Sequence, residues 1–162
     1  MITDVDFGHL ERAVDLAEAA LTAGDEPFGS VLVSATGEVL FTDHNRVSGG
    51  DRTRHPEFAI ARWAAEHLTP QQRVTSTVYT SGEHCPMCAA AHAWVGLGRI
   101  VYASSSEQLT AWRAEIGAPD SPVAPLPIQQ VAPGLTVHGP EPRLAQRVRG
   151  LHERRRRESP HD

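Results

Sequence analysis

Lysine is absent from this chain of 162 residues: all 15 basic residues are arginine, and 20 acidic residues outnumber them. The net charge of −5 argues against a surface that binds nucleic acid as a whole. Cysteine occurs only twice, as Cys85 and Cys88, and this C-x-x-C pair gives no disulfide framework. Because free thiols fit a reducing compartment, we expect a cytoplasmic protein.

Long apolar runs are also absent. No stretch approaches the roughly 18 apolar residues that a membrane-spanning helix needs. The first six residues lack the basic and apolar regions of a signal peptide. A chain of this length can bury roughly 70% of its unfolded surface in one core. We therefore expect a small soluble enzyme with one domain over residues 1–162 and no membrane segment.

The hydrophobic pattern alternates between a helical and a strand period along the chain. Helices are predicted over residues 5–23, 56–68, 86–95, 107–116 and 142–157, so a C-terminal helix begins at about residue 142. Strands are predicted over residues 28–34, 38–42, 74–80, 100–103 and 135–138, and the five prolines of residues 118–133 indicate a long loop. This order predicts a three-layer α/β/α sandwich with a central mixed sheet of about five strands.

Two short clusters carry one imidazole, two thiols and one carboxylate: His55-Pro56-Glu57 and Cys85-Pro86-Met87-Cys88. Pro is favoured at the first position of a helix, so His55 and Cys85 are expected just before two helices, with Cys88 one turn inside the second. Together His55, Cys85 and Cys88 could hold one zinc ion per chain. Three protein ligands leave the fourth tetrahedral position open, which is typical of a catalytic rather than a structural zinc site.

Two simpler interpretations of the Cys pair need weighing. A redox C-x-x-C motif would have no need of His55 or Glu57. A closed structural zinc site would need a fourth ligand. His84 is the obvious candidate, but its place next to Cys85 makes joint ligation awkward. The upstream His-x-Glu cluster therefore favours the catalytic site.

The motifs resemble those of the cytidine deaminase superfamily. H-x-E followed by P-C-x-x-C is its zinc signature; residues 55–57 match the first part and residues 80–88 match the second, except for the Pro before the first Cys. Residues 26–33 resemble the first strand of the branch that holds guanine, cytosine and tRNA adenosine deaminases, and residues 44–47 resemble its Asn motif. The resemblance covers residues 5–104. It implies a cytidine deaminase-like fold, one zinc ion and hydrolytic deamination, and suggests a homodimer because relatives commonly dimerise.

The resemblance also implies roles for individual residues. Glu57 would be the catalytic proton carrier, between the attacking water, a ring nitrogen and the leaving amine. Asn45 would hydrogen-bond the base or sugar, although a loop Asn that caps its own turn is the simpler interpretation. Phe28 and Trp94 are candidate aromatic walls for the substrate, and Trp94 could equally be a core residue.

Two departures from the family pattern concern the substrate. Relatives usually have Pro where this chain has His84, and Ala or Val where it has Pro56. In relatives the backbone N–H at the second position commonly binds a carbonyl oxygen of the substrate, and Pro has no N–H. Both Pro56 and His84 are therefore candidates for setting substrate choice.

We expect a deaminase in purine metabolism that acts on a free nucleobase or nucleoside, with guanine or a related aminopurine favoured. Cytosine and modified, triazine-like bases are alternatives because of Pro56. A tRNA adenosine deaminase would need a basic groove, which only the run Arg154 to Arg157 suggests, and a solvated helix end explains that run better. A non-enzymatic zinc domain is the last alternative, but it would have no use for Glu57.

Overall fold

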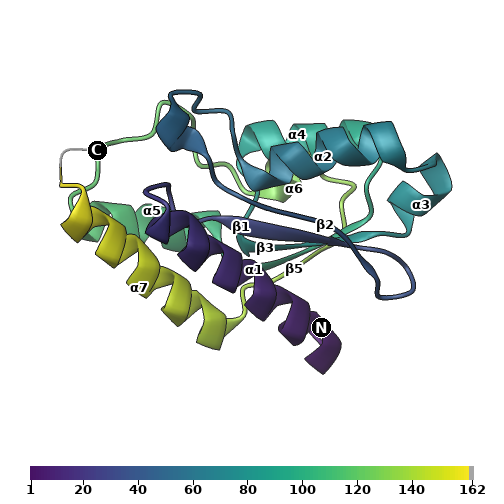
Figure 1. Ribbon diagram of the computed structural model, residues 1–162, viewed down its shortest axis with the longest axis horizontal. Coiled ribbons are helices and arrows are strands. Elements are labelled where there is room, and N and C mark those ends of the chain that lie inside the picture. The colour runs from purple at the N-terminus through teal and green to yellow at the C-terminus, as the bar shows by residue number, and fades with distance from the viewer. Residues whose placement is uncertain (161–162) are drawn as a thin grey trace.

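A computed structural model describes residues 1–160 of the chain (Figure 1). The helices are α1 (Asp4–Thr22), α2 (Pro56–His67), α3 (Pro70–Val74), α4 (Pro86–Val95), α5 (Ser106–Glu115), α6 (Ile128–Val131) and α7 (Pro142–Glu158), with a 3₁₀ turn at Val47–Gly49. The strands are β1 (Gly29–Val33), β2 (Val39–His44), β3 (Thr77–Gly82), β4 (Arg99–Ser104) and β5 (Val137–His138). None of the helices in this described part is long and apolar enough to cross a membrane.

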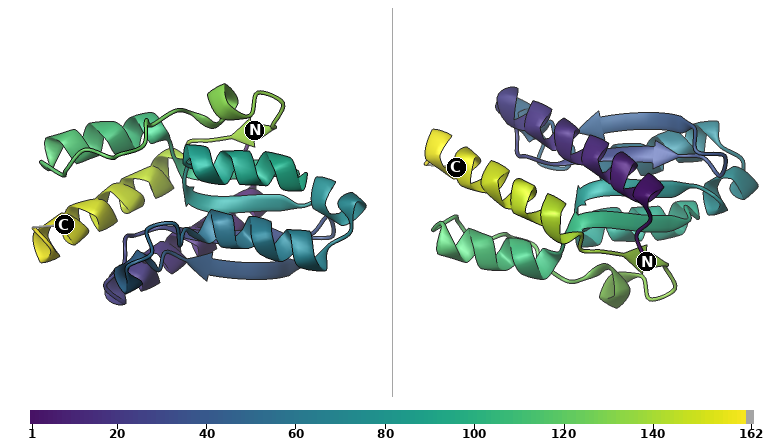
Figure 2. Two further views of the ribbon diagram at one scale, coloured as in Figure 1. Left: turned by 90° about the horizontal axis from the view of Figure 1, so that it is seen from above. Right: turned by 90° about the horizontal axis from the view of Figure 1, so that it is seen from below.

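The strands form one mixed sheet in the order β2-β1-β3-β4-β5. Strand β1 runs antiparallel to both β2 and β3, whereas β3, β4 and β5 are parallel. Helices α1, α5 and α7 contribute to the core on one face, and α2, α4 and α6 to the cores on the other. Figures 1 and 2 show the resulting layers, with the sheet between them. The predicted three-layer sandwich with a five-stranded mixed sheet is thus confirmed.

The two-residue period of a strand decides which side chains face the α2 layer. In β1, Val31 packs with α1 whereas its neighbour Leu32 packs with α2. In β3, Tyr79 packs in the core on the α1 side, whereas its neighbour Val78 packs in the core on the α2 side. Even-numbered positions of β1 and β3 therefore face α2. The first turn of this helix carries the His55-Pro56-Glu57 cluster.

Helix α1 lies directly on the start of β1 because residue 29 is glycine. A Cβ atom at Gly29 would lie within 2.6 Å of the Ala17 backbone nitrogen and would also collide with the Ala13 carbonyl oxygen. The side of β1 toward α1 is therefore closed by backbone.

Two short elements differ from the sequence prediction. Residues 70–74 form the helical turn α3, although Val74 was assigned to a strand. The turn forms because Thr69 and Gln72 make a reciprocal capping box and Pro70 starts the turn. The Pro-rich segment predicted as a loop contains α6, whose Ile128 is fully buried.

Candidate metal centre and active site

The two clusters meet at the starts of two neighbouring helices. His55 is the N-cap residue of α2 and Cys85 that of α4, each followed by Pro in the first turn. An N-cap residue has extended backbone geometry, so its side chain extends beyond the helix rather than along its flank. Cys88 lies one turn further along α4 and is buried.

The ligand atoms form a nearly equilateral triangle. Cys85 Sγ lies 3.5 Å from His55 Nδ1 and 3.5 Å from Cys88 Sγ, and Cys88 Sγ lies 3.6 Å from His55 Nδ1. Usual Zn–S and Zn–N bond lengths in a tetrahedron place such atoms about 3.6–3.8 Å apart. The group therefore fits one zinc ion. Among the described residues it is also the only group of His, Cys and acidic side chains close enough together to hold a metal.

The electrostatics of the group favour a thiolate at Cys85, whereas the hydrogen bond with Cys85 and burial raise the pKa of Cys88. The hydrogen bond with the Cys88 thiol lowers the pKa of Cys85 to about 4, although burial opposes this shift. The contact with Cys85 raises the pKa of His55 to about 8. A thiolate is the form of cysteine that binds a metal.

Glu57 lies in the first turn of α2 and is 5% exposed. Its Oε1 atom accepts hydrogen bonds from Thr80 Oγ1 at 2.8 Å and from Ser30 Oγ at 3.2 Å. Its Oε2 atom lies 3.9 Å from Cys88 Sγ. Burial raises the pKa of Glu57, and the charge of His55 opposes the shift. A buried carboxylate thus stands beside the metal group, with one oxygen held by the sheet and the other directed toward the ligands.

Phe28 and Asn45 lie next to each other where β1 begins and β2 ends. The Asn45 N–H donates to the Phe28 carbonyl oxygen at 2.9 Å, and Asn45 Oδ1 accepts from the Val47 N–H. The local turn therefore uses the Asn45 oxygen, as the simpler interpretation held. The buried Nδ2 atom has no partner within residues 1–160, so its two donor hydrogens are available to a ligand.

The structure decides one of the two interpretations of Trp94. This residue lies in the last turn of α4 and is 89% exposed, so the alternative that it is a core residue is wrong. Its role as an aromatic wall for the substrate stays a prediction.

The structure places His84 in the interior, and its role in substrate choice stays a prediction. Its side chain is 1% exposed and packs edge-on against His92, with ring centroids 5.3 Å apart. It does not belong to the metal group, and both ring nitrogens are buried without a hydrogen-bond partner among the described residues. His92 in turn contacts the Gly98 carbonyl oxygen through Nε2 at 2.8 Å. His84 therefore fills the interior behind α4.

Glu83, two residues before Cys85, makes two contacts that the sequence analysis did not predict. Oε2 accepts the Ser106 N–H and Oε1 accepts the Ile128 N–H, both at 2.8 Å. One carboxylate two residues before Cys85 therefore holds the starts of α5 and α6. No local pattern could have shown this, because the two donors lie 23 and 45 residues away.

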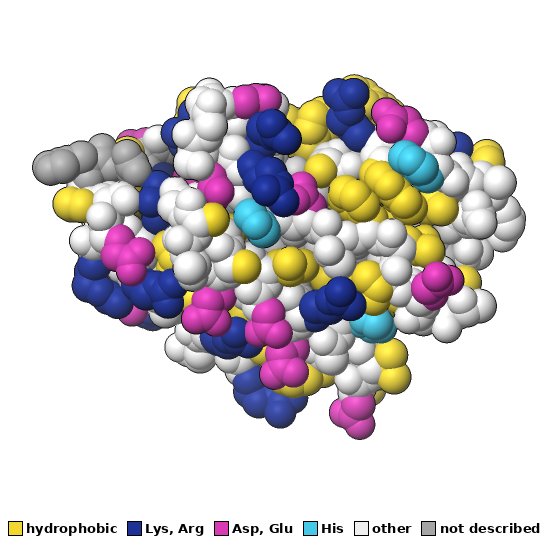
Figure 3. Space-filling model, viewed as in Figure 1, with side chains coloured by type: hydrophobic (Ala, Val, Ile, Leu, Met, Phe, Trp, Pro, Cys, Tyr) yellow, Lys and Arg dark blue, Asp and Glu magenta, His cyan; other side chains and the backbone are white. Residues whose placement is uncertain are grey.

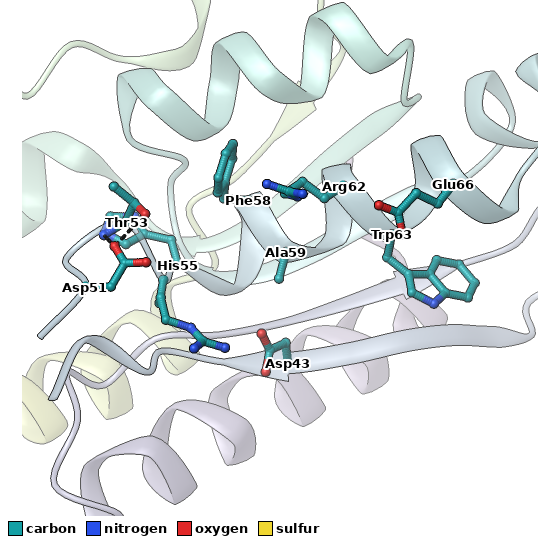
Figure 4. Close-up of a pocket in the computed structure, with 10 residues that line it drawn as sticks. Asp43, Asp51, Thr53, His55, Phe58, Ala59, Arg62, Trp63 and Glu66 are labelled. Atoms are coloured by element: carbon teal, nitrogen blue, oxygen red, sulfur yellow. Dashed lines mark hydrogen bonds between the residues drawn. The ribbon is translucent and has the colours of Figure 1, made fainter. Parts of the chain in front are cut away.

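A surface hollow of about 460 Å³ adjoins the metal group from outside (Figure 4). Its walls come from the outer side of α2, from β2 and from the loop between them. Acidic and basic side chains alternate around it, including Asp43, Arg62 and Glu66. Of the metal group only His55 lines it, so the hollow reaches the site from one side.

Helix α7 is attached to α1 by an apolar face and by Arg154. Leu144, Val148 and Leu151 are buried in the core shared with α1. Arg154 forms ion pairs with Glu18 of α1 and with Glu158. Arg154 is therefore engaged by contacts within the chain, which agrees with the interpretation of residues 154–157 as a helix end.

A five-stranded mixed sheet between helices, a His/Cys/Cys group that fits one zinc ion and a buried glutamate beside it are the features of the zinc-type deaminase family. Residues 4–104 match the model of the cytidine and deoxycytidylate deaminase zinc-binding region, and the chain belongs to this family.

Relatives within the family differ in their substrates. A probable cytosine deaminase of Schizosaccharomyces pombe is 32% identical over 67% of this chain and 65% of its own length, just under two thirds. The guanine deaminase of Bacillus subtilis is 34% identical over 69% of this chain and 70% of its own length. A tRNA-specific adenosine deaminase of Haemophilus influenzae is 29% identical over 64% of this chain and 60% of its own length. The solved guanine deaminase of Nitrosomonas europaea shares the fold, with a TM-score of 0.69 at 21% identity over 96% of this chain and 85% of that one.

Proposed function

We propose that this protein is a hydrolytic deaminase of a free nucleobase or nucleoside. Zinc held by His55, Cys85 and Cys88 would supply a water acidic enough to attack at neutral pH. The observation that carries the proposal is the buried Glu57 carboxylate, whose Oε2 atom lies 3.9 Å from Cys88 Sγ. A structural zinc site would have no use for a carboxylate there, and burying one is costly.

Glu57 would act as general base and then as general acid. It would accept a proton from the attacking water and pass it to the ring nitrogen next to the reacting carbon. The second proton of the water would then go to the leaving amine. Overall, water and the amino-substituted ring become ammonia and a ring with a carbonyl group. The two Cys residues bind metal in this scheme and form no bond with the substrate.

Guanine or a related aminopurine is the favoured substrate. Its support is the similarity to the guanine deaminase of B. subtilis together with two site residues, the half-buried Phe28 ring and the unpartnered Asn45 Nδ2. Trp94 adds nothing to this choice because it points to solvent. Cytosine is the main alternative, given the comparable identity to a probable cytosine deaminase. Triazine-like bases are a further one, because Pro56 lacks an N–H.

An RNA substrate has less support. The face in Figure 3 intermixes Arg with Asp and Glu instead of presenting a basic stripe. Arg154, within the Arg-rich helix end, is already engaged by Glu18 and Glu158. RNA binding depends on positive charge along the phosphate path. A small substrate therefore fits the surface better.

We also propose that the enzyme is a cytoplasmic homodimer. The support is Trp94, which is 89% exposed on α4, because aromatic residues are enriched where protein surfaces meet. Equilibrium sedimentation of the zinc-loaded protein tests the oligomeric state. A monomer over the micromolar range would contradict it.

Ammonia release from a substrate panel tests the proposed function. The panel contains guanine, other aminopurines, adenosine, cytosine, cytidine, aminotriazines and a tRNA anticodon stem-loop. Glu57→Ala protein prepared in parallel shows how much activity comes from contaminants. We expect the highest kcat/KM on an aminopurine. No release from any compound would refute the deaminase proposal, and a stem-loop that outperforms every small molecule would reverse the substrate class.

A further inference from the structure

Two hydroxyl side chains lie opposite each other beneath the start of α2. Ser30 of β1 and Thr80 of β3 are direct cross-strand partners, and both side chains are fully buried. Each has an even number and therefore points to the α2 face. Valine would be the ordinary choice at a buried central strand position, since a buried hydroxyl is unfavourable without a partner. The partner that both hydroxyls share is Glu57.

The two oxygens of Glu57 have different surroundings. Thr80 Oγ1 lies 2.8 Å and Ser30 Oγ 3.2 Å from Oε1, and the two hydroxyls lie 2.9 Å apart. Oε2 is contacted by neither hydroxyl and lies 3.9 Å from Cys88 Sγ. The sheet therefore binds one oxygen and leaves the other on the side of the metal group.

The number of hydroxyl hydrogens limits the arrangements that are possible. Each hydroxyl has one hydrogen to donate. If Ser30 donates to Thr80, the Thr80 hydrogen is free to donate to Oε1 at 2.8 Å. If Thr80 donates instead to the Gly82 carbonyl oxygen, 3.0 Å away, Ser30 can donate to Oε1 directly. In both of these arrangements one hydrogen points at Oε1, and a transferred proton on the Glu57 carboxyl group then belongs on Oε2.

We propose that Thr80, supported by Ser30, is the positioning residue of the catalytic glutamate: it fixes Oε1 so that Oε2 faces the His55–Cys85–Cys88 group. The inference rests on the proposed role of Glu57. It gives a role to two residues of the sheet, Ser30 and Thr80, to which the sequence analysis assigned none. The alternative is that the two hydroxyls merely fill space in the sheet.

Thr80→Val distinguishes these roles because it keeps the shape and removes the hydrogen. Crystal structures of the zinc-loaded wild type and variant should show the Glu57 carboxylate leaving its position in Thr80→Val and keeping it in Thr80→Ser. This measurement needs no substrate. Failure of the deaminase proposal, seen as no turnover of any compound, is thus distinct from failure of the positioning proposal.

Kinetics on the best substrate of the panel give the second measurement. Loss of a hydrogen bond to a charged group corresponds to a rate loss of about tenfold or more. We expect this loss in kcat for Thr80→Val with KM nearly unchanged, and recovery in Thr80→Ser. Thr77→Val is the matched control, because Thr77 begins the same strand but points to the opposite face, and its kcat should equal that of wild type.

A wild-type kcat in Thr80→Val, or an unmoved Glu57 in its crystal structure, would overturn the proposal. So would loss of zinc with Glu57 in place, because the hydroxyl would then serve the metal site. Should Thr80→Val fail to fold, Ser30→Ala decides by the same two measurements. Ser30→Ala should lower kcat by less than the tenfold expected for Thr80→Val, and its crystal structure should show Glu57 displaced. A wild-type kcat together with an unmoved Glu57 in Ser30→Ala would then overturn the proposal.

Discussion

Replacement of Asp6 by Asn should destabilise the protein in a manner that depends on pH. Asp6 lies in the first turn of α1 and is 3% exposed. Its carboxylate accepts hydrogen bonds from the Thr3 N–H at 2.9 Å and from the Tyr79 hydroxyl at 2.7 Å, and it pairs with Arg99 of β4. The contacts join the first turn of α1 to two strands of the sheet. Asn resembles the protonated acid, so Asp6→Asn removes the charge with little change in shape.

The size of the effect follows from the pKa. Burial alone would raise the pKa of Asp6, but the bonds from Thr3, Tyr79 and Arg99 outweigh it and lower the pKa from 3.8 to about 2. A shift of this size corresponds to about 2 kcal/mol of folding free energy. Because the pKa is lowered in the folded state, the contribution is fully present above about pH 4. It is lost as the pH falls toward 2.

Urea unfolding of both proteins at a series of pH values measures this contribution. The unfolding free energy of Asp6→Asn should be about 2 kcal/mol lower between pH 5 and 8. The difference should shrink toward zero near pH 2. Comparing the two proteins at each pH cancels changes common to both, including loss of metal in acid.

Asp4→Asn is the matched control, since Asp4 lies in the same helical turn but is exposed. Its effect should stay within about 0.5 kcal/mol, as for most surface substitutions. Equal stability of Asp6→Asn and wild type at pH 7 would refute the reasoning. A difference that persists unchanged to pH 2.5 would show that it does not come from the charge.

Three further predictions concern the active site. Elemental analysis should find one zinc per chain, and much less in Cys88→Ala because two ligands hold the ion poorly; unchanged zinc in that variant would remove Cys88 from the ligand set. Glu57→Gln should keep zinc and melting temperature but lose about 10²–10⁴-fold in turnover, the usual contribution of a general acid–base group, and near-normal ammonia release would exclude that role. Pro56→Ala should raise kcat/KM on guanine or cytosine, relative to the native substrate, by about ten- to a hundredfold. The reason is that alanine restores a backbone N–H, and a hydrogen bond from it to a buried carbonyl of the substrate avoids a cost of about 1–3 kcal/mol. An unchanged ranking in that variant would leave Pro56 as a helix-starting residue only.

The sequence predicted the larger elements because their signals are local. The helix of residues 86–95 was predicted from Pro86 and the apolar run that follows it, and α4 has these bounds. The short helix α3 was missed, although Thr69 and Gln72 carry its capping signature. There the β-branched Val74 and Thr75 were given more weight than the cap.

Prediction of the site succeeded where ligands sit next to helix starts and failed where contacts join distant strands. His55, Cys85 and Cys88 could be grouped because metal chemistry restricts the residue types that can take part. The role of Ser30 and Thr80 could not be predicted from residue type, since Ser and Thr are ordinary strand residues. Only the register between β1 and β3 shows that both face Glu57.

The way Glu83 holds α5 and α6 bears on how freely the last third of the chain can vary. Both hydrogen bonds come from backbone N–H groups, those of Ser106 and Ile128. Every amino acid except proline supplies this donor. The segment can therefore exchange side chains during evolution without losing its attachment beside the metal loop, and new substrate contacts can be tried there while the zinc chemistry is retained. Proline at either position is the substitution that this attachment forbids.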